Sequence, residues 1–225
     1  MTATFTAVCP SIVPAHTQAM LASCKFPVDV IDNTHRNRGV SASWNQGVRL
    51  MRDRGDGWLV IVSSSVRFGA PGGCDLIAAL DAECVAVEGA PHLGWHLIAF
   101  RADVFDVVGL FDPHYMPGYL EDTDMAHRIS LGFGLNPPYW RKVDVDATLT
   151  GYGEAVAATG IDVQIDRLIA YEAHKWNGHP GDPDADLFTT PFGLDVPLSW
   201  HPPLDDPRGT YPLEWPDPGR GTPGP

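Results

Sequence analysis

Hydrophobic residues in the first hundred positions are grouped in short continuous runs. A run of this kind, bounded by turn residues, is typical of a strand that is buried on both faces of a sheet. The most uniform one is WLVIV at 58–62. The pattern predicts four strands in this part of the chain, at 4–10, 28–32, 58–62 and 84–89.

Helical spacing fills the intervals between these runs. In the longest interval apolar side chains recur every three or four positions, and Gly55 follows as a stop signal. Regular alternation of strand and helix favours right-handed crossovers and an open, mostly parallel sheet with helices on both faces, which is an α/β fold. The pattern predicts helices at 16–24, 38–55 and 74–82.

The second half of the chain continues with both kinds of element. We expect a strand and a short helix within 94–112, and a late strand at 139–151. Two further helices are expected at 120–132 and 160–176. In the last helix the spacing assigns four apolar residues to one face: Ile161, Ile165, Leu168 and Ile169.

The end of the chain differs in composition from the rest. Nine of the 29 residues from Pro197 onward are proline, with glycine and aspartate between them. Such a segment cannot form a core of its own, and either wraps the domain or is disordered. We therefore divide the chain into one α/β domain at 1–196 and a proline-rich tail at 197–225.

Composition narrows the classes of function. A net charge of −13 argues against nucleic acid as a partner, because binding by bulk electrostatics needs basic residues. The sequence has no apolar stretch long enough for a membrane span, and the segment MTATFTAVCP lacks the basic and apolar regions of a signal peptide. The four cysteines show no CxxC pairing, and Cys9 and Cys84 lie in apolar runs. We expect a cytoplasmic protein with reduced thiols.

Candidate binding residues follow the predicted strands. In open α/β sheets ligands bind beyond the carboxyl ends of the strands. That rule points to Pro10 and Ser11, to Asp32 and Asn33, and to the serines at 63–65. The Asp32 carboxylate could accept hydrogen bonds from a nucleobase or a ribose, or it could form an Asx-turn with Asn33.

Three separate stretches carry a resemblance to one family. DNTHRNRGVSASWNQGV, at 32–48, resembles the segment of family 2 glycosyltransferases in which an Asp closes the second strand and an N-x-G…N-x-G helix follows. The segment 95–129 resembles their acceptor side, where a strand, a G-x-F-D turn and an E-D-x-D…R helix occur in this order. YEAHKWNGHPGDPDADLFTTPF, at 171–192, is similar to a K-W-G-G…F…P-F ending, with Asn177 in place of the first glycine.

The resemblance spans roughly residues 4 to 192, and it implies a GT-A fold and an enzyme, a glycosyltransferase. It implies a nucleotide-diphosphate sugar as donor substrate and an acceptor hydroxyl. Gly39 could let the backbone approach a phosphate, and Arg38 and Arg67, with Arg36, could neutralise the diphosphate or form a solvated rim. The donor-binding candidates are Pro10, Ser11, Asp32, Asn33, Arg38, Gly39, Asn45, Ser63, Ser64, Ser65 and Arg67.

The same resemblance suggests residues for the acceptor. Trp95 and His96 are candidates because aromatic faces suit sugar rings, with core packing as the alternative. The stretch HKWNGH at 174–179 adds Lys175 and Trp176 to the candidate binding residues. Its histidine spacing does not match that of zinc enzymes.

The sequence departs from the family where a metal is expected. Family members carry a D-x-D-like cluster after the third buried strand, where it holds Mg²⁺ or Mn²⁺, but this chain has Ser63-Ser64-Ser65. Neutral hydroxyls are poor ligands for hard divalent cations. The later TLTGYGE stretch also lacks a histidine. The metal requirement therefore stays open: metal-independent transfer comes first, followed by recruitment of Asp75 or Asp124, or an inactive relative that only binds.

The acidic start of the helix at 120–132 has two interpretations. Carboxylates favour the first turn of any helix, and Asp124 with Arg128 could be an ordinary surface pair. The helical wheel, however, places Asp122 on the same face as Met125 and Ile129. The resemblance implies that Asp122 is the general base of an inverting transfer, with Glu121 and Asp124 orienting the acceptor or anchoring the loop. The alternative function is a non-catalytic module that binds a nucleotide sugar or a glycan.

Overall fold

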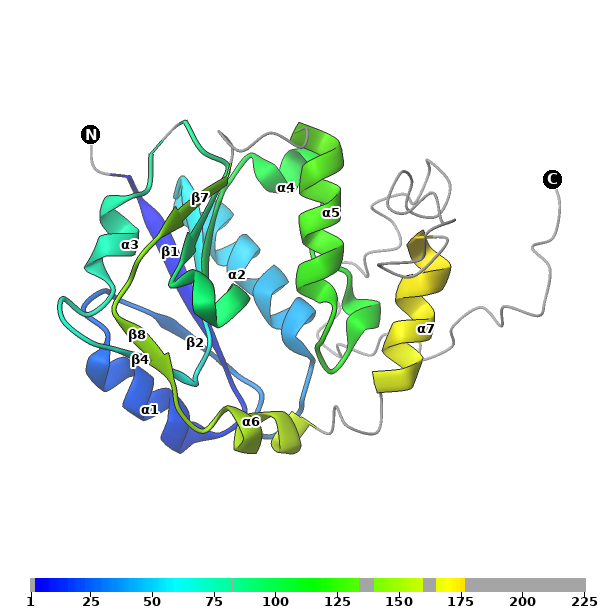
Figure 1. The fold of residues 1–225 in the computed structure, drawn as a ribbon, viewed down its shortest axis with the longest axis horizontal. Helices are drawn as coiled ribbons and strands as arrows, with labels where there is room; N and C mark the ends of the chain where they lie inside the picture. The colour runs from blue at the N-terminus through cyan, green and yellow to red at the C-terminus, as the bar shows by residue number, and fades with distance from the viewer. Residues whose placement is uncertain (1–2, 82, 134–139, 160–164, 177–225) are drawn as a thin grey trace, which may run out of the picture.

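The computed structural model describes residues 3–81, 83–133, 140–159 and 165–176 (Figure 1). The predicted tail at 197–225, the domain boundary at 196 and Ile161 lie outside the described residues. The described chain forms an α/β domain, with helices on both faces of a central sheet (Figure 1).

The central sheet has six strands in the order β2-β1-β3-β6-β5-β7. β1 pairs in parallel with β2 and β3, and β5 pairs in parallel with β7, while β6 runs antiparallel to both of its neighbours. The predicted open, mostly parallel sheet is confirmed, and its arrangement is consistent with a Rossmann-like GT-A fold. The strands are β1 (Phe5–Ser11), β2 (Asp29–Asp32), β3 (Trp58–Val62), β5 (Ala86–Gly89), β6 (Leu97–Arg101) and β7 (Trp140–Val143).

Two strands lie outside this sheet. β4 (Val66–Phe68) and β8 (Ala147–Leu149) pair antiparallel with each other. The helices are α1 (Pro14–Ser23), α2 (Val40–Arg54), α3 (Cys74–Ala78), α4 (Val104–Val107), α5 (Glu121–Phe133), α6 (Tyr152–Thr159) and α7 (Ile165–Trp176), with 3-10 turns η1 (Pro91–His96) and η2 (Pro113–Tyr115).

Both faces of the sheet are buried, because strand residues alternate between two cores. In β3, Trp58, Val60 and Val62 contribute to the core beneath α1, α3 and the small sheet. Leu59 and Ile61 contribute to the opposite core, beneath α2, α4 and α5. All five side chains are buried, which explains why WLVIV is continuously apolar.

Several details differ from the sequence prediction. The late strand at 139–151 is two strands, and β7 and β8 join different sheets. β4 and α6 were not expected, because their segments are short and lack a clear period. In α7, Leu168 is buried but Ile169 is exposed, so the predicted apolar face is wrong at that position. Cys9 and Cys84 are buried free thiols, as expected.

Candidate functional site

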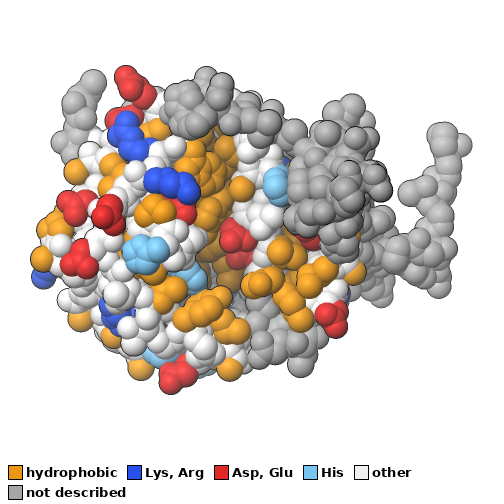
Figure 2. All heavy atoms as spheres, viewed as in Figure 1, with side chains coloured by type: hydrophobic (Ala, Val, Ile, Leu, Met, Phe, Trp, Pro, Cys, Tyr) orange, Lys and Arg blue, Asp and Glu red, His pale blue; other side chains and the backbone are white. Residues whose placement is uncertain are grey.

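A cavity of about 400 Å³ opens at the carboxyl ends of β1 and β3. The start of α2, the turn η1, the start of α5 and the helix α6 complete its wall. On the face drawn in Figure 2, hydrophobic side chains line a hollow, and acidic and histidine side chains lie beside it. The predicted site residues that line the cavity are Pro10, Asn33, Gly39, Ser63, Ser64, Ser65, Trp95, His96, Glu121 and Asp122. The structure therefore brings donor-side and acceptor-side candidates together.

The strand ends are held in register by short contacts. The backbone N–H of Asn33 donates to the carbonyl of Ser11 over 2.8 Å, which ties the end of β2 to β1. The Asn33 side-chain amide donates to Ser43 Oγ in α2 at 2.8 Å. The N–H of Ser63 donates to the carbonyl of His96 over 2.8 Å, so η1 is fixed against the end of β3.

Gly39 joins the start of α2 to the loop that precedes α5. Its φ of 82° lies in the left-handed region, where a side chain is strained. A Cβ at this position would lie 3.1 Å from Met116 Cγ. The next N–H, that of Val40, donates to the carbonyl of Pro117 at 2.9 Å. The glycine therefore permits a close approach of two walls of the cavity.

The three acids at the start of α5 occupy different environments. Glu121 is buried and Asp122 is half-buried, and both line the cavity, whereas Asp124 is fully buried away from it. Burial, followed by the negative charge of Asp122, raises the pKa of Glu121 to about 8. The Asp122 carboxylate accepts a hydrogen bond from the N–H of Thr123 at 2.8 Å. Because the three acids differ in burial and in access to the cavity, we expect them to differ in function.

His96 and Tyr152 face the acidic side of the cavity. Burial lowers the pKa of His96, and the charge of Asp122 opposes this shift only in part. The two rings contact edge to face, with centroids 4.9 Å apart. Burial raises the pKa of Tyr152, and the charges of Tyr119, Glu121 and Asp122 add to the shift. These side chains share one electrostatic environment.

Sequence reasoning missed several residues of the cavity, among them Tyr119, Leu120 and Tyr152. Tyr119 and Leu120 line it with φ angles of 89° and 70°, which are strained values for residues other than glycine. Only the preceding Pro117-Gly118 turn could have drawn attention to them. Tyr152 was missed because it lies in the unexpected helix α6.

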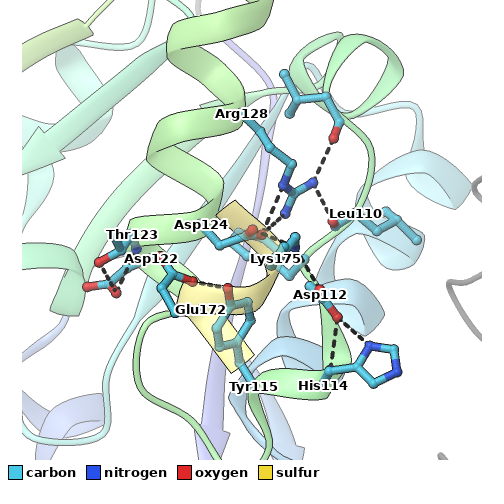
Figure 3. A network of polar contacts seen from close by, with 12 residues as sticks. Leu110, Asp112, His114, Tyr115, Asp122, Thr123, Asp124, Arg128, Glu172 and Lys175 are labelled. Carbon is cyan, nitrogen blue, oxygen red and sulfur yellow. Dashed lines mark hydrogen bonds and ion pairs between the residues drawn. The ribbon is translucent and has the colours of Figure 1, made fainter. Parts of the chain in front are cut away.

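Asp124 belongs to a buried ionic network (Figure 3). Its Oδ2 is 2.7 Å from Arg128 Nη2, and its Oδ1 is 2.5 Å from Lys175 Nζ. The indole N–H of Trp176 donates to Oδ1 at 3.1 Å. The expected surface pair of Asp124 and Arg128 is wrong, since the two side chains are 0% and 10% exposed. In Figure 3, Asp122 points away from this cluster.

Lys175 connects the two ends of the loop before α5. Its ammonium group lies 2.7 Å from Asp112 and 2.5 Å from Asp124, and the Tyr171 hydroxyl donates to Asp112 at 2.6 Å. Burial opposes ionisation of Asp112, but Lys175 and His114 hold its pKa well below the usual value. Lys175 and Trp176 are buried and do not line the cavity. The prediction that they contact an acceptor is corrected: they support the loop that does line it.

The Asn45 side chain also supports the fold, because its hydrogen bonds are to the protein backbone. Its side-chain amide donates to the carbonyl of Phe111 at 2.8 Å and accepts from the N–H of Phe111 at 2.9 Å. These bonds fasten α2 to the segment before η2. Ser11 is buried, and its hydroxyl accepts from Thr17 at 2.7 Å. The structure therefore places neither of these donor-binding candidates in the cavity.

Three further candidates surround the cavity without lining it. Asp32 forms the Asx-turn that was the alternative interpretation: the turn passes through Asn33 and closes with the Thr34 N–H, and hydrogen bonds from the Thr34 hydroxyl and N–H lower the pKa of Asp32. Arg67 donates to the carbonyls of Ser64 and Val66, each at 2.8 Å. Arg38 is exposed beside Gly39.

The side chains present do not fit a divalent cation at the serine stretch. Ser63 Oγ accepts from the N–H of Ser65 at 3.3 Å, and the cavity edge there offers hydroxyls rather than carboxylates. Asp124 is committed to its cations, and Asp75, in the first turn of α3, does not line the cavity. Among the described residues no group of three His, Cys, Asp or Glu side chains could hold a metal ion.

The sequence matches no family model and none of the curated proteins. Among solved structures, the chain is similar to A197 from STIV, with 10% identity over 65% of this chain and 85% of that one, and a TM-score of 0.46. It is also similar to a glycosyltransferase involved in the glycosylation of the major capsid of PBCV-1, with 7% identity over 63% and 82% of the two chains and a TM-score of 0.33. At these scores the likenesses carry no argument about activity. In the described part of the chain no helix has the length and apolar character needed to cross a membrane.

Proposed function

We propose that this protein is a glycosyltransferase that moves a sugar from a nucleotide-diphosphate sugar to an acceptor hydroxyl. The observation that carries the proposal is that candidate residues for the donor and for the acceptor line the same cavity. Asn33 and the serines at 63–65 lie at the strand ends, and the carboxylates Glu121 and Asp122 lie opposite, at the start of α5. Binding beyond the carboxyl ends of parallel strands is the general behaviour of open α/β sheets.

Asp122 is the proposed general base. It lines the cavity, is only half-buried, and turns away from the Lys175 network, so a ligand can reach it. In an inverting displacement the acceptor oxygen attacks the anomeric carbon while the bond to the diphosphate breaks. The acceptor proton passes to Asp122, and the bonding electron pair leaves with the diphosphate.

Glu121 would act differently from its neighbour. With a pKa of about 8 the carboxyl group is mainly protonated at neutral pH, so it can donate a hydrogen bond to an acceptor oxygen. Its buried position also makes it well placed to orient rather than to exchange protons with solvent. Two adjacent acids would thus divide the tasks of orienting and deprotonating the acceptor.

The donor diphosphate would be stabilised without a metal in the proposed mechanism. Arg38 and Arg67 flank the strand-end side of the cavity, and the serine hydroxyls can donate hydrogen bonds. An alternative that fits the same cavity is a module that binds a nucleotide sugar without transferring it. The serines at 63–65 favour the binding module if transfer requires a metal, because their hydroxyls are poor ligands for a divalent cation.

A two-part experiment tests the proposal. Thermal unfolding is followed with a panel of nucleotide-diphosphate sugars, with EDTA or with Mn²⁺, because a ligand raises the melting temperature in proportion to its occupancy. Donors that stabilise the protein are then tested for hydrolysis and for transfer to a glycan mixture. Stabilisation with turnover in EDTA supports the proposal, and turnover only with Mn²⁺ contradicts the metal-free form. Stabilisation without turnover under any condition supports the binding module, and no stabilisation by any donor contradicts both.

A further inference from the structure

The acidic side of the cavity lacks a basic counterpart. Glu121 and Asp122 line it, while none of the described lining residues is a lysine or an arginine. The histidine of the lining, His96, has its pKa lowered by burial and is therefore mainly neutral at pH 7. Arg67 lies near the serine side, but its guanidinium group donates to backbone carbonyls.

Elsewhere in the same domain, buried carboxylates are neutralised by lysine and arginine side chains. Asp124 has both Arg128 and Lys175 within 2.7 Å, and Asp112 has Lys175 at 2.7 Å. A buried carboxylate without a cation is costly, which is why the folded chain supplies one at these two positions. At the cavity, one helical turn away, the folded chain supplies none among the described residues. A ligand can supply it instead.

Unpartnered polar atoms point to the same kind of ligand. Three cavity residues each have a buried oxygen without a hydrogen-bond partner in the described structure: Glu121 Oε2, Asn33 Oδ1 and Ser65 Oγ. The side chains of Asn33 and Ser65 are 4% and 0% exposed, so water reaches them poorly. Carboxylate and amide oxygens are acceptors, and a buried acceptor is normally satisfied. The missing partner of Asn33 Oδ1, on the strand-end side, is therefore a hydrogen-bond donor, whereas the Ser65 hydroxyl and the Glu121 carboxyl can each donate as well as accept.

Aromatic side chains stand beside the two acids. Tyr119 and Tyr152 line the cavity although they are 50% and 43% exposed, which is high for large rings. Trp95 lines it from η1. Aromatic faces attract an ammonium group and also stack on sugar rings. Carboxylates, open acceptors and aromatic faces together match a ligand that is both a sugar and a cation.

We infer that the acceptor side of this cavity selects an amino sugar, with its ammonium group beside Glu121 and Asp122. The inference rests on the proposed function only in calling this the acceptor side. Binding of the amino sugar can be measured without any transfer. It also separates the two substrates in space, because the carboxylates disfavour a diphosphate near them and leave it to the Arg38 and Arg67 side.

Three disaccharides with the same β-1,4 glucose backbone test the inference by calorimetric titration at about pH 6. Chitobiose in its free-amine form carries ammonium groups, N,N′-diacetylchitobiose carries acetamides, and cellobiose carries hydroxyls at the same carbons. We expect the free amine to bind about tenfold more tightly than the other two, because one hydrogen bond between an ammonium group and a carboxylate contributes a free energy of about that size. Equal or weaker binding of the amine overturns the inference.

Two variants and one further ligand complete the experiment. Asp122→Asn and Glu121→Gln keep the side-chain shapes. Asp122→Asn removes a negative charge and should reduce the preference for the amine over cellobiose, whereas Glu121→Gln, which like the protonated Glu121 carries no charge at pH 6, should change that preference little. If a variant fails to fold, the comparison of disaccharides on the unmodified chain still decides. A lysine-containing peptide that binds as tightly as the amine disaccharide would show that the site reads an ammonium group alone, which overturns the assignment to a sugar.

The outcomes separate this inference from the proposed function. Preference for the amine without transfer from any donor supports the inference and contradicts the glycosyltransferase. Transfer that proceeds equally to cellobiose and to the amine supports the glycosyltransferase and contradicts the inference.

Discussion

Two groups of carboxyl side chains lie one helical turn apart at the start of α5. Basic side chains of the protein neutralise one group and not the other. Asp124 is fully buried and contacts Arg128, Lys175 and Trp176. Glu121 and Asp122 line the cavity, and none of the described lining residues is a lysine or an arginine. The difference shows which carboxylates serve the fold and which are left for a ligand.

The difference has an energetic basis. Removing one partner of a buried ion pair leaves an uncompensated charge and costs about 3–5 kcal/mol. Asp122 is half-buried and keeps some contact with water, and the buried Glu121 is mainly protonated at neutral pH, so neither carries the full cost of a buried, ionised carboxylate without a partner. The first group should therefore control stability, and the second should control binding and activity. Four changes test this division, from the largest expected effect to the smallest.

Replacing Asp122 by Asn should have the largest effect, and on activity alone. Loss of a general base lowers kcat by about 10²- to 10⁴-fold. The melting temperature should change little, since the hydrogen bonds of Asp122 are local ones to Thr123. Steady-state kinetics with the best donor and thermal unfolding measure the two quantities. Unchanged kcat would remove Asp122 from the proposed mechanism.

Replacing Lys175 by Met should destabilise the fold by about 3–5 kcal/mol, because Asp112 and Asp124 lose their shared cation. The matched control is Lys142→Met, since Lys142 is 65% exposed and lies 3.7 Å from Glu88. Glu88 is buried, but the Lys142 ammonium group is largely exposed and screened by solvent, so this pair should contribute less than about 1 kcal/mol. Urea unfolding of both variants measures the difference. Similar losses in the two variants would contradict the assigned role of Lys175.

Replacing Glu172 by Gln should change how stability depends on pH. Glu172 is buried beside Tyr115, whose hydroxyl donates to it, and burial raises the pKa of Glu172 from 4.5 to about 7. Because the folded state holds this proton more tightly than the unfolded state, the contribution of Glu172 to stability is greatest below pH 4.5 and is lost as pH rises through 7. The loss is up to about 3 kcal/mol.

The Gln variant cannot lose that proton. Its stability should therefore fall less between pH 5 and pH 8 than that of the unmodified protein, as followed by urea unfolding at several pH values. Glu121, whose raised pKa acts in the same direction, is present in both proteins and does not alter the comparison. Parallel pH profiles would show that Glu172 is ionised in the folded state throughout this range.

Replacing Asn45 by Ala should have the smallest effect of the four, about 2 kcal/mol of stability. Two buried backbone groups of Phe111 lose their partner, and each unsatisfied group costs about 1 kcal/mol or more. Stabilisation by a donor nucleotide sugar should persist in the variant. Selective loss of donor binding with unchanged stability would restore Asn45 to the donor site.

Much of the fold was predictable because the strands are buried on both faces. WLVIV at 58–62 is continuously apolar for that reason, and the Val40–Arg54 helix has a regular apolar period that ends at a left-handed Gly55. The antiparallel direction of β6 was not predictable in the same way. A strand buried on both faces has the same pattern in either direction, and only its pairing with β3 and β5 fixes it.

The candidate site was predicted in part. The rule that ligands bind at strand ends located Asn33 and the serines at 63–65, and the acidic helix start located Glu121 and Asp122. The sequence did not predict the role of Lys175, because a positive charge near the end of α7 gave no sign that two distant carboxylates would enclose it. Tyr152 was missed for a related reason, since its place on the cavity depends on where α6 packs.

The sequence by itself determined the α/β class, most strand and helix positions and the presence of three acids within four residues of α5. Those properties depend on local period and residue type. Only the tertiary structure decided that Asp124 is neutralised by Lys175 and Arg128 while Glu121 and Asp122 line an open cavity. The charge and burial of a carboxylate depend on residues that are distant in the chain, and no local pattern specifies them.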